Sequence, residues 1–358
     1  MHVVSEPTGS YGDTLMRLAR QHGCTTAWVS GEVVNKAKVI ENNDAGKSNE
    51  KDPRIIFMLS TMGKEQTHRQ LPARYQALRE LNRAYDAEDQ RRSSMKCEIQ
   101  LLVGRLFVDF PMSKDFIFDE SGAILMNLYA FNPYRIAPKT LKQFSKRMRK
   151  KSPHIYPTTL EKVHKAAKQS INLCIPVETI ESLEQRLRYV WEDYQRADQR
   201  REELRAQISA HYQTLWDSGE KVPQADSEVL TAFLLGRILG ETGPLSDFAS
   251  DEMLLRYAGL NLRVRESGTY RGKLKLSKKG RATIRLLLGK AIFRMIRQEA
   301  VFGEYYHRRK KQDKLCGKQL IAILMRKLLR ITFACARHRS AFDADRLIKC
   351  ESQYKKAA

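Results

Sequence analysis

The residues best suited to chemistry lie in one basic stretch, Arg263 to Arg281, which reads RVRESGTYRGKLKLSKKGR. It sets cations beside hydroxyl groups and glycines. Contact with phosphate uses this mixture, because positive charge attracts the polyanion and small residues let backbone N–H groups approach the strand. The stretch therefore predicts contact with a nucleic-acid backbone. The residues expected to make that contact are Arg263, Arg265, Tyr270, Arg271, Lys273, Lys275, Lys278, Lys279 and Arg281.

Ser267 lies inside this stretch, between Glu266 and Gly268. A serine is a weak nucleophile unless its proton is removed or its alkoxide is stabilised. Neighbouring arginines would stabilise both the alkoxide and the charge that develops on an attacked phosphate. A loop serine among cations can also simply donate a hydrogen bond to phosphate, and the residues alone leave both roles open. Tyr270, Tyr305 and Tyr306 could stack on bases.

The charge balance of the whole chain supports a polyanionic partner. The chain has 358 residues, with 64 Lys and Arg against 41 Asp and Glu, a net charge of +23. Residues 261–314 alone hold seventeen cations and four acids. Such a field attracts DNA, RNA or acidic membrane. No apolar run reaches the roughly 20 residues that span a bilayer, and Met1 to Ser10 lacks the pattern of a secretory signal, so membrane is the weaker interpretation. The alternative is a solvated surface without a ligand.

The cysteines indicate no metal or disulfide framework. Six are present, none in a C-x-x-C pair, and histidine is scarce around them. We therefore expect reduced thiols and a cytoplasmic protein.

The elements that position these residues follow from periodicity. Residues 1–69 indicate a small α/β domain, and a chain that opens inside a strand indicates that a leading strand or hairpin is missing. Residues 177–215 carry an apolar stripe with flanks of alternating charge, which predicts a coiled-coil or hairpin arm. A helix lying on its own domain is the alternative. Lys139 to Lys151 hold seven basic residues and no acid.

The expected fold class is mixed α/β and α, in four parts. The predicted strands cover 2–5 and 24–29, with helices at 13–21, 32–40, 55–62, 70–108, 177–215, 227–241, 250–258, 282–301 and 319–336. The predicted parts are an α/β domain over 1–69, a helical and coiled-coil region over 70–222, a mainly α-helical domain over 223–340 and a basic tail over 341–358.

Ordered motifs in the third part resemble a known family. Val229 to Phe248 is an apolar helix followed by a Glu-Thr-Gly turn and an Asp-Phe pair, and Leu255 to Leu262 reads LRYAGLNL. Ser267-Gly268 and the run LSKKGRATIR from Leu276 follow, and the helix from Lys318 to Leu329 completes the order. Together these resemble the C-terminal domain of the insertion-sequence 110/116/902 transposases. The resemblance implies that Ser267 is the nucleophile that attaches to DNA.

The N-terminal part resembles the same family over a shorter span, where an RNase H/RuvC-like fold supplies acidic residues. Glu6-Pro-Thr-Gly-Ser-Tyr11 matches the turn that carries the second acid, and Asp52 matches the fourth. Asn49 stands where the third carboxylate is expected, and no residue matches the first. The resemblance implies that Glu6 and Asp52 are catalytic and hold Mg²⁺, which hard carboxylate oxygens favour. From the residues alone, Glu6 could instead cap a turn and Asp52 begin a helix before Pro53.

The resemblance implies a DNA transposase or recombinase that cuts and rejoins DNA through Ser267, assisted by the acidic residues. It also implies DNA and a structured guide RNA as partners, with Lys139 to Lys151 as an RNA contact, and a homo-oligomer formed through the arm. Two alternatives stay open. One is a catalytically impaired remnant that only binds DNA or RNA, and the other is a site-specific DNA invertase.

Overall fold

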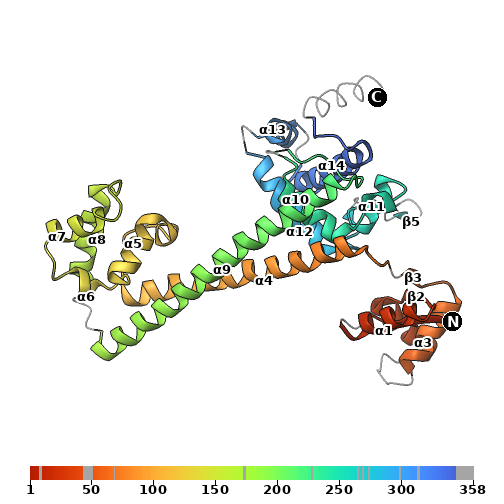
Figure 1. Ribbon diagram of the computed structural model, residues 1–358, viewed down its shortest axis with the longest axis horizontal. Coiled ribbons are helices and arrows are strands. Elements are labelled where there is room, and N and C mark those ends of the chain that lie inside the picture. The colour runs from red at the N-terminus through yellow and green to blue at the C-terminus, as the bar shows by residue number, and fades with distance from the viewer. Residues whose placement is uncertain are drawn as a thin grey trace. The chain divides into compact units, whose positions relative to one another are not determined.

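A computed structural model describes residues 1–7, 10–42, 51–67, 69–171, 175–226, 229–263, 266–267, 270–272, 275–297, 300–312 and 315–343. The chain forms two units, Met1–Pro72 and Ala73–Ala358. Most described residues are helical, as the ribbon in Figure 1 shows, so the expected fold class is confirmed in its coarse form, mainly α with a small α/β part. The likeness of the first part to an RNase H/RuvC fold stays a prediction.

The first unit is a three-stranded sheet with three helices. Strand β1 (His2–Ser5) pairs in parallel with β2 (Thr25–Trp28), and β3 (Gln66–Thr67) pairs antiparallel with β2. Helix α1 (Ser10–Gln21) joins the two parallel strands, and α2 (Gly31–Asn42) and α3 (Lys51–Thr61) follow. Buried Val29, Val34, Ala37, Ile55 and Leu59 form its core. The strands and helices predicted over 2–62 are thus present, whereas β3 was not predicted.

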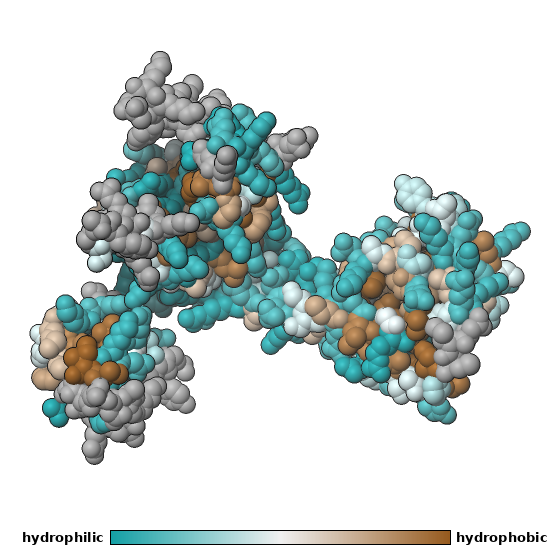
Figure 2. All heavy atoms as spheres, turned by 180° about the vertical axis from the view of Figure 1, so that it is seen from behind, coloured by the Kyte–Doolittle hydropathy of each residue, from teal (hydrophilic) through white to brown (hydrophobic). Residues whose placement is uncertain are grey.

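The second unit is built on a pair of long helices, α4 (Ala73–Leu106) and α9 (Val177–Asp217). Glu98 pairs with Arg186, and Arg92 pairs with Asp198. The residue further along α4 pairs with the residue that comes earlier in α9, so the two helices run antiparallel. They lie side by side in Figure 1. Most of the apolar stripe predicted for 177–215 is buried, mainly against α4 and also against other helices of the same chain. We call this helix pair the arm. On the face drawn in Figure 2 its helices are mostly hydrophilic.

Residues 107–171 form a helical lobe at one end of the arm, which we call the distal lobe (Figure 1). It contains η1 (Phe116–Phe118), α5 (Glu120–Tyr129), α6 (Pro133–Ile136), α7 (Leu141–Arg149) and α8 (Pro157–Ser170). Its buried side chains share one core with the ends of α4 and α9. Thr140 begins α7 with a capping box closed by Gln143, which satisfies N–H groups that a helix start leaves without partners.

The C-terminal region packs on the other end of the arm. Helix α10 (Ala232–Thr242) lies against both α4 and α9, and two glycines allow this close approach. A Cβ at Gly240 would lie 2.5 Å from the Asn82 amide nitrogen, and one at Gly236 would lie 2.7 Å from an Ile208 methyl. The region continues through η3 (Leu245–Asp247), α11 (Asp251–Tyr257), β4 (Leu262–Arg263), β5 (Glu266–Ser267), β6 (Tyr270–Arg271), β7 (Lys275–Leu276), α12 (Ala282–Met295), α13 (Gly303–Gln312) and α14 (Gly317–His338).

The predicted helix bounds in this region need three corrections. The helix expected over 227–241 begins only at Ala232, because the Asp226 carboxylate accepts hydrogen bonds from the N–H groups of Val229 (2.7 Å) and Leu230 (3.1 Å) and holds them in a turn. The helix expected over 282–301 ends at Met295. The sequence reading missed α13, whose highly charged sequence has little apolar periodicity. No helix of the described residues is long and apolar enough to cross a membrane.

Candidate nucleic-acid interface

Two sequence motifs meet at the base of the basic stretch. The turn after α11 contains Tyr257 to Leu260, and the segment before α12 contains Ser277 to Arg281. Backbone hydrogen bonds join them: the N–H of Lys278 donates to the Gly259 carbonyl (3.0 Å), that of Arg281 to the Tyr257 carbonyl (2.9 Å), and that of Ser277 to the Asn261 carbonyl (2.9 Å). These bonds fix both ends of the stretch, and we call this region the motif junction.

Glycine is required on both sides of the motif junction. Gly259 has φ +67° and Gly280 has φ +148°, conformations that side chains disfavour. A Cβ at Gly280 would lie 2.5 Å from the Gly259 nitrogen and 2.9 Å from its Cα. The two backbones therefore touch at this point, which explains the glycines of the YAGL and SKKG motifs.

A buried carboxylate ties the motif junction to the arm. Glu241 lies in the last turn of α10 with its side chain 5% exposed, and the Arg281 Nε donates to it at 2.8 Å. Arg79 of α4 donates to the carbonyls of Gly240 and Glu241, each at 2.9 Å. Burial, together with the charge of Arg281, lowers the pKa of Arg79. Arg281 was predicted to contact nucleic acid. Its Nε is instead occupied by the ion pair with Glu241, although the Arg281 side chain remains 35% exposed.

Ser267 lies on the inner of two short antiparallel ladders that follow the motif junction, one enclosed by the other in sequence. Strands β4 and β7 form the base, with Arg263 opposite Lys275. Strands β5 and β6 form the next ladder, with Ser267 opposite Tyr270. Ser267 is exposed. The stretch predicted as a loop therefore contains short strands, and Ser267 on one of them is exposed to solvent.

Several predicted cations lie on the β4–β7 ladder or directly after it, and this ladder flanks the serine ladder in sequence. Arg263, Lys275 and Lys278 are exposed and have no ion-pair partner among the described residues. Arg263 and Lys275 are directly opposite each other, an arrangement of like charges that is unfavourable unless an anion offsets it. Lys279 is also exposed, and its N–H donates to the Ser277 hydroxyl. Arg265 and Lys273 lie outside the described residues, as do the side-chain surroundings of Tyr270 and Arg271.

The two other predicted stacking residues lie on α13. The Lys327 ammonium is 4.6 Å from the Tyr305 ring centroid, and the Lys310 ammonium is 6.0 Å from that of Tyr306. Both rings therefore contact cations of their own region. Since a stacked base would compete with these contacts, their role in binding stays a prediction.

The predicted acidic residues belong to the first unit. Glu6 follows β1, and its carboxylate lies where a Cβ on Gly31, the first residue of α2, would overlap it. Asp52 lies in the first turn of α3 and forms an ion pair with Lys38, whose side chain is 2% exposed. Sequence reasoning missed Lys38, because nothing in the pattern of α2 marks a lysine as buried. Asn49, Asp44 and Glu50 lie outside the described residues.

No group of three or more His, Cys, Asp or Glu in the described part of the chain is placed to hold a metal ion. The binding of Mg²⁺ by Glu6 and Asp52 stays a prediction, and the Lys38 ammonium already neutralises one of the two carboxylates.

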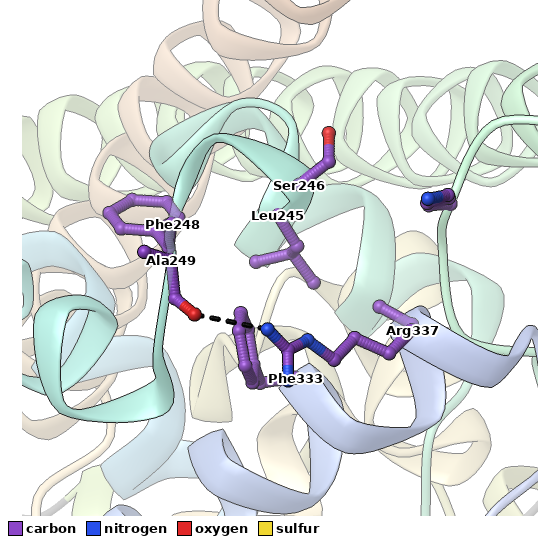
Figure 3. Close-up of a pocket in the computed structure, with 8 residues that line it drawn as sticks. Leu245, Ser246, Phe248, Ala249, Phe333 and Arg337 are labelled. Carbon is purple, nitrogen blue, oxygen red and sulfur yellow. Dashed lines mark hydrogen bonds between the residues drawn. The ribbon is translucent and has the colours of Figure 1, made fainter.

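A small pocket lies between the Leu245–Ala249 segment and α14, with a volume of about 200 Å³ (Figure 3). Phe248 and Phe333 line it, and the Arg337 guanidinium donates to the Ala249 carbonyl at 3.0 Å. The contact fastens the Asp-Phe motif to α14. None of the lining residues was predicted to bind a ligand, and we interpret the pocket as a packing feature.

Residues 232–307 match the family model described as Transposase IS116/IS110/IS902 family. The matched segment begins with α10 and ends within α13, so it contains Glu241, the motif junction and Ser267. No curated protein matches the chain. The match confirms the family resemblance inferred from the motifs within residues 232–307, and the resemblance of the N-terminal part stays a prediction.

Proposed function

We propose, on the premise that this chain belongs through residues 232–307 to the IS116/IS110/IS902 transposase family, that it is an insertion-sequence transposase acting on DNA through Ser267. The observation that carries the proposal is an exposed serine on a short ladder, flanked in sequence by cations that have no ion-pair partner among the described residues. Family membership supports transposition in general, and this geometry supports the finer assignment.

In the proposed reaction the Ser267 Oγ attacks a backbone phosphorus atom. The new P–O bond joins the chain to one DNA end, the bond to the leaving oxygen of the other end breaks, and the serine proton passes to a base. Arg263 and Lys275, which pair with each other on the ladder that flanks Ser267 in sequence, would hold the phosphate and offset its developing charge. Reversal on a second DNA end, whose hydroxyl attacks the phosphoserine, rejoins the strands and restores the serine.

Mg²⁺ is the cofactor that the family resemblance implies, with Glu6 and Asp52 as its ligands, and it would stabilise phosphate charge when bound. Two carboxylates, one of them paired with Lys38, are a poor match for a divalent ion that prefers several oxygen ligands.

A binding-only protein is the second candidate, and the Asp52–Lys38 ion pair is the observation that favours it. If the acidic residues serve only the fold of the first unit, the cationic region would still grip DNA or RNA without cutting it. A guide RNA as partner and a homo-oligomer, both implied by the family resemblance, are likewise proposals. The apolar stripe on which the oligomer prediction rested is buried against α4 within the chain.

Covalent capture of DNA tests the two candidates. End-labelled duplex carrying the element's own termini is incubated with the full chain, and adducts that survive denaturing electrophoresis are counted. We expect an adduct with the unmodified chain and with Ser246→Ala, a control that removes another exposed serine of the same region. Ser267→Ala should give none, while its affinity for DNA falls by less than about tenfold, since one neutral hydrogen bond contributes about 0.5 to 1.5 kcal/mol.

An adduct that persists in Ser267→Ala would remove this residue from the chemistry. Strong DNA binding without any adduct from the unmodified chain would favour the binding-only candidate instead.

A further inference from the structure

The distal lobe carries a second concentration of positive charge, separate in sequence from the Ser267 region. Residues 135–170 contain eleven Lys and Arg, and Glu161 is the single acid among them. The segment has a density of net charge higher than that of residues 261–314. A charge excess of this size repels itself, so it is retained more readily where an anion offsets it.

The fold turns these cations outward on two neighbouring helices. In α7, Phe144 and Met148 are buried, while Lys142, Lys146 and Arg149 follow the opposite face and are exposed. This separation is the one expected from a period of 3.6 residues.

Helix α8 repeats the arrangement, with Val163 and Ala167 buried and Lys162, Lys165 and Lys168 exposed. The two helices pack directly on each other, and the His164 ring stacks on Phe144 at 5.9 Å. An imidazole nitrogen of His164 also lies 2.8 Å from the Lys139 carbonyl. The lobe therefore holds both sets of cations on one small framework.

Ion pairing distinguishes the distal lobe from the arm. On α9, Arg186, Arg188, Arg196 and Arg201 each have a carboxylate partner within 4 Å. From Lys139 to Lys168, by contrast, no Lys or Arg has such a partner in the described part of the chain. Among the described residues, the arm therefore pairs many of its cations with its own carboxylates, whereas the cations of the lobe from Lys139 to Lys168 have no carboxylate partner.

The chemistry of the surface points to phosphates of a polynucleotide. The exposed large apolar side chains of α7 and α8 are limited to Leu141, which is 37% exposed, and insertion into lipid would need several. Tyr156, at the start of α8, is 76% exposed and offers a ring for stacking. Several lysines and arginines beside one exposed ring suit a phosphodiester backbone with accessible bases or sugars.

We propose that α7 and α8 form a second polynucleotide-binding surface, which works independently of the Ser267 chemistry. Asn82 contacts α10 and Leu102 lies in the core shared with the lobe. These residues are twenty positions apart on α4, so roughly 30 Å of helix separates the lobe from the C-terminal region. This is close to one turn of a duplex, about 34 Å. The chain can therefore hold a longer nucleic acid at two points, or two segments at once.

Salt titration of the full chain tests the proposal. The variant K142Q/K146Q/R149Q removes three cations from the exposed face of α7. The matched control R83Q/R196Q/R200Q removes three exposed cations from the arm. Affinity for a random-sequence 20-base-pair DNA duplex and for an RNA hairpin with as many phosphates is measured by fluorescence anisotropy between about 50 and 200 mM NaCl.

We expect the lobe variant to bind at least about tenfold more weakly at the lower salt and to lose about 2 to 3 units from the slope of log affinity against log salt, since each phosphate contact contributes about 0.9. The control should lose less than about 1 unit. Loss for DNA alone, RNA alone or both would each support the surface and identify its polynucleotide. Equal slopes in the lobe variant and the control would overturn it.

A charge-preserving variant separates charge from folding. K142R/K146R/R149K should bind like the unmodified chain, and a loss as large as that of the glutamine variant would contradict an electrostatic surface. Adduct formation at saturating DNA should continue in the lobe variant. Since that adduct reports on Ser267 and the slope reports on the lobe, failure of one proposal can be told from failure of the other.

Discussion

Arg281 offers the sharpest test of how the motif junction is held, because its structural role and a role in DNA contact predict different results. Its Nε donates to Glu241, whose carboxylate is 5% exposed. Arg281→Ala would leave that carboxylate buried with its strongest described partner removed. The expected consequence is a loss of stability in the second unit, before any effect on DNA is considered.

The size of the loss follows from burial. Removing one partner of a fully buried ion pair costs about 3 to 5 kcal/mol. Water reaches the Arg281 side chain, which is 35% exposed, and this weakens the pairing. We therefore expect about 2 kcal/mol for Arg281→Ala, which corresponds to a fall of roughly 4 to 8 °C in Tm. Calorimetry of the full chain measures it.

A double-substitution cycle completes the test. If the cost arises from an unpaired buried charge, Glu241→Gln added to Arg281→Ala should recover about 1 kcal/mol. Lys275→Ala is the matched control, because it removes an exposed cation of the same stretch and should leave Tm unchanged. A Tm for Arg281→Ala equal to that of the control would refute the structural role and leave Arg281 as a phosphate contact only.

Two further substitutions probe other parts of the second unit. Gly280→Ala should lower the free energy of unfolding by about 3 kcal/mol, because φ +148° and backbone atoms within 3 Å leave no room for a methyl group. Urea titration measures this free energy, and a change below about 1 kcal/mol would contradict the close contact. Glu184→Ala should cost about 2 to 3 kcal/mol, since it leaves the buried Asn132 amide without its acceptor, while Glu181→Ala on the same helix should cost little. Burial alone would raise the pKa of Glu184, but hydrogen bonds from Asn132 and an arginine and two nearby positive charges lower it on balance. The stabilisation that Glu184 provides should therefore be present above the carboxyl pKa of the unfolded chain and be lost as pH falls through the lowered pKa of the folded chain. An acid titration in which the unmodified chain and Glu184→Ala lose stability in parallel would contradict this pH dependence.

Local sequence determined most of the elements, and it indicated the family resemblance that residues 232–307 bear out. Helical periodicity located α4, α9 and α14, because an amphipathic helix needs apolar residues every three or four positions whatever it packs against. The motifs behind the family resemblance include Gly259 and Gly280, positions where the fold excludes side chains. The charge of residues 261–314 indicated a polyanion, since charge is a property of composition and does not depend on folding.

Tertiary structure alone decided which groups meet. The stripe on α9 indicated an apolar face, but only the fold shows that α4 of the same chain covers it. The pairs Lys38–Asp52 and Arg281–Glu241 join residues 14 and 40 positions apart, and no local pattern marks them. A period in the sequence specifies which face of an element is apolar, whereas the partner of a side chain depends on where the chain returns. The predicted contacts of Arg281 and Asp52 therefore had to wait for the structure.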